Sequence, residues 1–158
     1  MPLKLFERST WDPNPMPKSN FFVQIPAQFV WLMNTNSDQC FTQEACSGQL
    51  RDLLGLTTKM HHLKDLRYNF LIGDDGNVYE AKGWYHAPLL PLRFARSNCY
   101  SLLIAFIGKQ SVINLSEAAA EQLGDLIEFG IENGLIKRDF ELKNIMVAVR
   151  SGGLKTNV

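Results

Sequence analysis

The chain has 158 residues, 46% of them hydrophobic and 11% aromatic, and sixteen basic residues balance sixteen acidic ones. This length and composition predict one domain over residues 1–158 that buries most of its apolar surface. The zero formal charge excludes an overall field that would gather nucleic acid or an anionic membrane. A ligand must therefore be held by a shaped site.

No run of about eighteen apolar residues is present, so the sequence predicts no transmembrane helix. The start, MPLKLFERSTWDP, lacks the apolar stretch of a secretory signal. Both features fit a mature form as well as a segment of a longer protein.

The first third of the chain predicts an extended segment, a strand and a helix. Residues 1–28 hold five of the seven prolines, which is typical of a segment that runs extended and packs on the surface of its domain. The apolar run FVWLM, residues 29–33, predicts a central strand. Thr42 is placed to cap a helix that ends near His62. Four residues share the inward face of that helix: Cys46, Leu50, Leu53 and Leu54.

Residues 67–84, RYNFLIGDDGNVYEAKGW, predict two strands folded back on each other. Tyr68, Phe70 and Ile72 alternate with other side chains, and residues 74–77 supply turn chemistry before the extended pattern resumes. By itself, a hairpin of this kind is architecture and indicates no function.

The last third predicts a buried strand, a second helix and a short final strand. SLLIAFIG, residues 101–108, is a continuous apolar run, and Ser116 begins a helix that Asn133-Gly134 ends. Residues 146–149 form the last predicted strand. The inward stripe of the helix is Leu123, Leu126, Ile127 and Ile131. Strands interleaved with two amphipathic helices predict an α/β fold, a central mixed sheet with helices packed against it.

The sequence offers few candidates for catalysis. Its only histidines are His61, His62 and His86, whereas a catalytic zinc site commonly needs three protein ligands and an open position. Adjacent histidines on a helix point about 100° apart and rarely bind one ion. A solvated helix end is the better interpretation of His61 and His62.

Two aromatic residues of the hairpin each have two interpretations. Tyr68 is either a ligand contact and proton donor or a half-buried core residue. Trp84, which follows Gly83, is either a stacking platform for a ligand or a plug at the rim of the core. Since no GxSxG, P-loop, HExxH or CxxC pattern occurs, the residues favour a binding module over an enzyme, with no cofactor and no metal.

Two further short patterns bear on the compartment. Cys40 and Cys46 lie close together while Cys99 stands apart, and spacing alone allows a local disulfide or two free thiols equally well. Asn114-Leu115-Ser116 fits the glycosylation acceptor pattern, which also matches by chance.

The hairpin segment YNFLIGDDGNVYEAKGW resembles the pattern YNFLIGGDGNVYEGRGW of animal peptidoglycan recognition proteins. RSTW at residues 8–11 resembles the opening of that family, and SLLIAFIG its strand SIGISFIG. AAAEQLGDLIEFGIENGLI resembles its last long helix. These matches cover most of residues 8–143 in order, and the resemblance implies the zinc amidase fold and a disulfide between Cys40 and Cys46.

The resemblance also implies that catalysis is absent. Catalytic members are zinc amidases that cut the bond between N-acetylmuramic acid and L-alanine. Met33 stands where their first histidine ligand is expected, Ile145 at the second ligand, and the Ser151 region at the cysteine ligand. A thioether is a soft ligand poorly suited to a hydrolytic zinc, and isoleucine cannot coordinate a metal. Tyr68 matches the catalytic tyrosine, but without a metal-bound water it has nothing to act on.

For ligand binding, the resemblance gives a mixed picture. Gly83-Trp84 matches a Gly-Trp pair associated with diaminopimelic-acid peptidoglycan. Arg96 lies near the basic residue for the diaminopimelate carboxylate, although strict spacing puts Cys99 there. Leu63 replaces a tryptophan and residues 88–90 replace a Gly-Ala-His, so we expect a groove that is damaged, narrowed or filled.

The stretch from Ala87 to Leu92 is a candidate partner surface. If exposed, its apolar residues would form the centre of an interface: Pro88, Leu89, Leu90 and Leu92. The alternative is a loop folded over the vacant groove of its own domain.

The leading hypothesis is a non-catalytic recognition domain of an innate immune receptor or regulator, which acts by association with a related recognition domain, with or without a bound muropeptide. It implies an extracellular location, either secreted or in the ectodomain of a membrane receptor. The second hypothesis is a free-standing binder of diaminopimelic-acid-type muropeptides that uses Tyr68, Trp84 and Arg96. The third is an amidase with a rewired metal site.

Overall fold

The computed structural model describes residues 2–145, 147–150 and 153–156. Its centre is a six-stranded sheet in the order β1-β4-β3-β5-β2-β6. All neighbouring pairs are parallel except β3 and β4, which form the predicted antiparallel hairpin. The strands are β1 (Leu5–Phe6), β2 (Ala27–Asn34), β3 (Phe70–Ile72), β4 (Val78–Glu80), β5 (Ser101–Phe106) and β6 (Ile136–Asn144). The predicted mixed sheet is thus confirmed.

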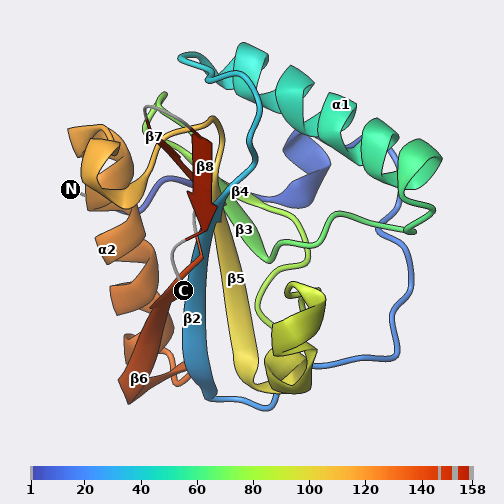
Figure 1. Ribbon diagram of the computed structural model, residues 1–158. Helices are drawn as coiled ribbons and strands as arrows, with labels where there is room; N and C mark the ends of the chain where they lie inside the picture. The colour runs from blue at the N-terminus through green and yellow to red at the C-terminus, as the bar shows by residue number, and fades with distance from the viewer. Residues whose placement is uncertain (1, 146, 151–152, 157–158) are drawn as a thin grey trace.

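Helices cover both faces of this sheet (Figure 1). Helix α2 (Glu117–Glu132) packs on one face, where its Leu126 joins a core that includes Val30, Phe70 and Ile104. Helix α1 (Gln43–Met60) packs on the other, where its Leu50 meets Leu71 and Tyr79. Side chains alternate along each strand, so neighbouring residues such as Phe70 and Leu71 belong to different faces.

Both long helices begin at the predicted caps. The Thr42 hydroxyl accepts a hydrogen bond from the Ala45 amide, and the Ser116 hydroxyl accepts one from the Ala119 amide, each 3.1 Å long. Beyond the end of α2, Gly134 has a φ of 71°, which glycine adopts without strain. Within the described residues, no helix is long and apolar enough to cross a membrane.

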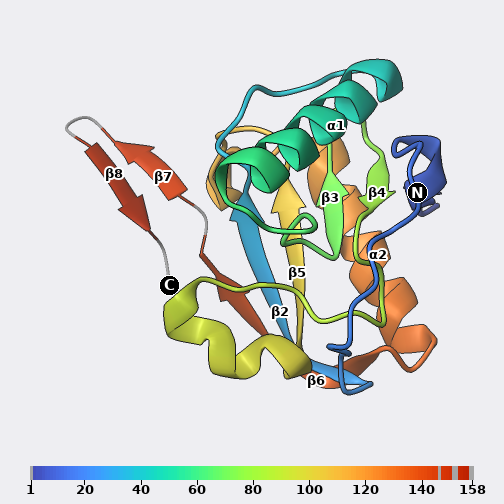
Figure 2. The ribbon, with the colours of Figure 1, turned by 90° about the vertical axis from the view of Figure 1, so that its right-hand side faces the viewer.

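The N-terminal segment is integrated more deeply than its prolines predict. Residues 5–6 form edge strand β1, whose Leu5 pairs with Val78 of β4, and Trp11 is fully buried. A 3-10 turn, η1 (Arg8–Thr10), lies between them. Residues 12–26 then run along the edge of the molecule to β2 (Figure 2).

The final third contains elements that the sequence did not predict. Strand β6 is mostly exposed, and its sequence IKRDFELKN is rich in charged residues, so it contains no apolar run that would predict a strand. A 3-10 segment, η2 (Leu92–Tyr100), precedes β5, and a shorter one, η3 (Val112–Asn114), follows it. The strand predicted over residues 146–149 corresponds to β7 (Val147–Arg150), which pairs with β8 (Gly153–Thr156) in a separate sheet. Met146 lies outside the described residues.

Candidate functional site

The residues at two expected metal-ligand positions lie in one apolar cluster on the α1 side of the sheet. Met33 comes from β2 and Ile145 follows β6, and both pack in the same cluster as Tyr68. The Ile145 amide donates a 2.8 Å hydrogen bond to the Leu32 carbonyl, which fixes its place beside β2. Ser151 lies outside the described residues. The cluster is completed by Phe29, Trp31, Leu90, Phe94 and Leu103.

Tyr68 keeps its hydroxyl available in this cluster. Burial raises the pKa of the Tyr68 phenol, and the nearby positive charge of Arg67 offsets part of that effect. The phenol is therefore neutral at pH 7. Its hydroxyl makes no hydrogen bond to any residue that the structure describes, so it remains a free donor.

The loop over residues 87–92 is mostly folded onto its own domain. Pro88 is buried, and Leu90 is 3% exposed within the apolar cluster. Its amide is held by a 3.0 Å hydrogen bond to Asn98 Oδ1. Burial of Pro88 and Leu90 favours the alternative of a loop folded onto its own domain, and Leu90 packs in the same cluster as Met33 and Tyr68. Leu89 and Leu92 remain exposed.

Trp84 lies on the opposite face of the sheet from Tyr68. Its ring centroid is 4.6 Å from that of Phe70 and 5.9 Å from that of Phe129 on α2. Gly83 before it has a φ of 74°, which turns the chain at this point. Trp84 and Tyr68 therefore pack in different clusters, and the packing of Trp84 favours the alternative that it plugs the rim of the core.

Arg96 is exposed on η2 and forms no hydrogen bond or ion pair with the part of the chain that the structure describes. Cys99, which strict spacing places at the family's basic position, is a free and half-buried thiol. Cys99 lines a cavity of the domain, whereas Arg96 does not line it.

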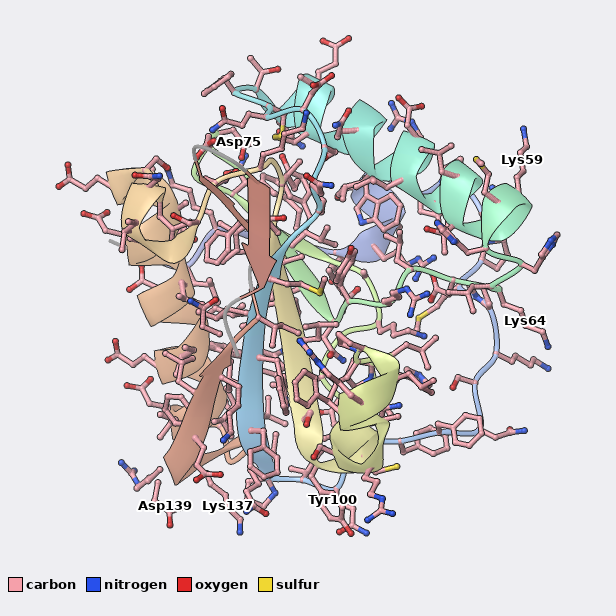
Figure 3. All side chains as sticks on the ribbon, in the orientation of Figure 1. Lys59, Lys64, Asp75, Tyr100, Lys137 and Asp139 are labelled. Carbon is pink, nitrogen blue, oxygen red and sulfur yellow. A yellow bond between two sulfur atoms is a disulfide. The ribbon has the colours of Figure 1, made fainter. Side chains whose placement is uncertain are left out.

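That cavity has a volume of about 560 Å³ and lies between the N-terminal segment, the loop after α1, the loop after β4 and η2. Four of the positions assigned to the groove line it, namely Leu63, Pro88, Leu89 and Cys99. The N-terminal wall is formed by residues 17–21. Lys59 in the last turn of α1 and Lys64 in the loop after α1 both project outward, away from the sheet (Figure 3). A cavity of this size suits a small ligand.

A buried ionic cluster beside the cavity was missed from the sequence. Arg8 donates two hydrogen bonds to Asp65, of 3.0 and 2.8 Å, and a third of 3.0 Å to Asp12. Burial alone lowers the pKa of Arg8, but these two carboxylates raise it above its usual value. Lys82 also approaches Asp65. In the sequence analysis, only Arg8 was noted, as part of the segment RSTW. Charged residues usually lie on the surface, so their burial cannot be predicted unless their partners are known.

The remaining sequence predictions concern histidine, cysteine and asparagine. His61 and His62 are exposed at the end of α1, as the solvated interpretation predicted. Among the described residues no group of three or more His, Cys, Asp or Glu side chains could hold a metal ion. The disulfide between Cys40 and Cys46 is confirmed. Asn114 is exposed at the end of η3, and its glycosylation stays a prediction.

A mixed sheet between two helices, with an apolar cluster where a metal would be bound, defines an amidase-like domain. Residues 24–150 match the family model of N-acetylmuramoyl-L-alanine amidase. The chain belongs to this family and, within it, to the animal peptidoglycan recognition proteins. The fold and family expected from the hairpin are therefore confirmed.

The curated relatives include two from Drosophila melanogaster. The chain is 32% identical over 134 residues to peptidoglycan-recognition protein LC, covering 85% of this chain and 26% of LC. It is 31% identical over 134 residues to protein SA, covering 82% of this chain and 63% of SA. The chain thus spans about a quarter of LC and under two thirds of SA.

Solved structures show the same fold. Bumblebee PGRP-SA has a TM-score of 0.82 at 27% identity, covering 90% of this chain and 83% of that one. The ectodomain of the Drosophila transmembrane receptor PGRP-LCa has a TM-score of 0.80 at 30% identity, covering 89% and 83%. Peptidoglycan recognition protein-LE, solved with tracheal cytotoxin, a monomeric diaminopimelic acid-type peptidoglycan, has a TM-score of 0.79 at 27% identity, covering 89% and 81%.

Proposed function

We propose that this chain is a non-catalytic peptidoglycan recognition domain of an extracellular receptor or regulator, and that it acts by association with a related recognition domain. The observation that carries the proposal is the apolar packing of Met33 and Ile145 at two expected ligand positions. Without a Lewis acid, hydrolysis loses several kcal/mol of transition-state stabilisation.

Two neighbours support recognition as the retained activity. One is the ectodomain of a transmembrane receptor, and another binds a diaminopimelic acid-type peptidoglycan fragment. In this chain the positions of Leu63, Leu89 and Cys99 still surround a cavity. Partner binding is supported by Leu92, which is 92% exposed at the start of η2.

The cavity also favours a second candidate, a free-standing muropeptide binder. In that case Tyr68 would act as a hydrogen-bond donor from the cluster beside the groove, and the domain would need no partner. Both candidates predict recognition without cleavage.

Calorimetric titration with a monomeric diaminopimelate-type muropeptide, first alone and then with a related receptor domain, separates the candidates. We expect binding only when the related domain is present. Binding by the domain alone would favour the free-standing binder. Failure to associate with any related domain, with or without muropeptide, would contradict the leading proposal, and bound stoichiometric zinc together with muropeptide cleavage would establish an amidase.

A variant pair sharpens the titration. Tyr68→Phe removes the free hydroxyl, and Tyr100→Phe removes an exposed hydroxyl on η2 as a matched control. If Tyr68 contacts the muropeptide, only the first variant weakens binding, by about fivefold to tenfold.

A further inference from the structure

A second cavity lies where strands β2 and β5 end. These strands are parallel neighbours, but the chain after β2 leads to α1 on one face of the sheet, and the chain after β5 leads to α2 on the other. A crevice forms between two such connections, and in open α/β sheets ligands bind in crevices of this kind. The cavity has a volume of about 430 Å³, and the residues that line it are all polar: Ser37, Asp38, Gln39, Lys109, Gln110 and Asn114.

Asn114 is both a lining residue of this second cavity and the first residue of the glycosylation pattern. Its side chain is exposed at the end of η3, so a glycan can be attached to its amide nitrogen. The first sugar of an N-linked glycan is N-acetylglucosamine, which offers hydroxyl groups and one amide for hydrogen bonding. Because the sugar is joined covalently at the wall of the cavity, its binding is intramolecular and requires little intrinsic affinity.

Gln110 contributes a hydrogen-bond acceptor that lacks a donor. Its Oε1 is buried and accepts no hydrogen bond from the part of the chain that the structure describes. Its Nε2 lies 3.5 Å from the Ile107 carbonyl, which is a weak hydrogen bond. The backbone is held firmly, because Asn34 Nδ2 donates a 2.8 Å hydrogen bond to the Gln110 carbonyl. A weakly held carboxamide on a fixed backbone can turn toward an occupant of the cavity, and the amide N–H of N-acetylglucosamine is a suitable donor for its oxygen.

We propose that the first N-acetylglucosamine of a glycan on Asn114 binds in this second cavity and joins the loop after β2 to the loop after β5. The glycan then lies against the carboxyl ends of the strands instead of extending freely into solvent. Because η2 precedes β5 and the second cavity follows it, the glycan begins at the opposite end of β5 from η2. The inference rests on glycosylation of Asn114 and does not depend on the proposed recognition function.

The test compares three forms of the protein by thermal unfolding. The first form comes from a secreting host and carries the intact glycan. In the second form, an endoglycosidase has trimmed the glycan to its single attached N-acetylglucosamine. The third form is made without glycosylation, and mass spectrometry verifies all three.

We expect the intact and the trimmed forms to unfold at the same temperature, about 2–4 °C above the unglycosylated form, because the first sugar makes the contacts with the cavity. Gln110→Leu should remove most of this gain, whereas Gln110→Glu, which keeps an oxygen acceptor, should retain it. Hydrogen exchange provides a second measurement. The amides of residues 37–39 and 108–114 should exchange more slowly in the trimmed form than in the unglycosylated form.

The matched control moves the glycan away from the cavity. The double variant Asn114→Gln with Gly55→Asn removes the natural pattern and creates the pattern N-L-T over residues 55–57 of α1. A Cβ at residue 55 has no atom within 4 Å, so a sugar attached there has no cavity to enter. A single N-acetylglucosamine at this position should leave the unfolding temperature of the double variant unchanged.

Equal unfolding temperatures of the trimmed and unglycosylated wild type would overturn the inference. A gain that survives Gln110→Leu, or that the glycan on α1 also produces, would overturn it as well, and so would the absence of a glycan from the wild type. None of these results bears on the recognition function, which the muropeptide titration tests separately.

Discussion

Arg8 ties the N-terminal segment to the loop before β3 through its hydrogen bonds to Asp65, and to the end of β4 through one of 3.1 Å to the Ala81 carbonyl, while its bond to Asp12 lies within the segment. The side chains of Arg8, Asp12 and Asp65 are all buried. A buried ion pair of this kind adds modestly to stability as a whole, but removing one partner leaves the other charge without compensation.

Arg8→Met should therefore lower the free energy of unfolding by about 3–5 kcal/mol, because two buried carboxylates lose their main partner. Urea unfolding measures this difference. Arg138→Met is the matched control, since Arg138 is exposed on β6 and should change stability by less than about 0.5 kcal/mol. A loss below about 1 kcal/mol in Arg8→Met would contradict the role assigned to this cluster.

The sequence predicted the environment of some single residues and missed that of others, including Arg8. The positions of Met33 and Ile145 were predictable, because a motif in a strand fixes its position in the sheet. The face on which Trp84 packs was not, since it depends on the turn at Gly83 after β4 has ended. Burial of Arg8 and Lys82 was also invisible, because their partner Asp65 is distant from both along the chain.

At the scale of elements, Ser116 combines two roles at the start of α2. Its hydroxyl caps the helix by accepting a hydrogen bond from the Ala119 amide, and it also completes the glycosylation pattern that begins at Asn114. The exposed side chain of Asn114 is accessible to modification. Substitutions can separate these roles.

In protein made without glycosylation, Ser116→Ala should lower the free energy of unfolding by about 1 kcal/mol through loss of the cap. Asn114→Gln should leave it unchanged, and Ser116→Thr should keep most of it. In a secreting host that glycosylates, mass spectrometry should find a glycan on the wild type and on Ser116→Thr only. An unmodified wild type would refute the glycosylation prediction but not the cap.

Elements were predictable where local chemistry and burial agree. Thr42 and Ser116 predicted the starts of α1 and α2, and the apolar run over residues 101–108 predicted β5. Strand β6 pairs with β2 at the edge of the sheet and is mostly exposed, so neither an apolar run nor regular alternation marks it. Strand β1 has two residues and exists only because β4 lies beside it. Such strands depend on tertiary pairing, which a local pattern does not contain.

At the scale of the whole molecule, the zero formal charge provides no overall electrostatic attraction to a partner. Association must therefore depend on complementary shape and apolar contact. Among the exposed large apolar side chains that the structure describes, Leu92 at the start of η2 has the highest exposed fraction, 92%. Exposed apolar residues at the centre of an interface carry much of its affinity. The proposed association should therefore depend on Leu92.

Leu92→Glu should weaken association with a related recognition domain by about tenfold or more, because a charge would then be desolvated in the interface. Sedimentation or calorimetry with the purified pair measures this. Ile113→Glu is the matched control, because Ile113 is 87% exposed but lies on η3, away from η2. Both variants should unfold at the wild-type temperature, as exposed positions contribute little to stability. Equal association of both variants would place the partner surface elsewhere and leave Leu92 without a role in binding.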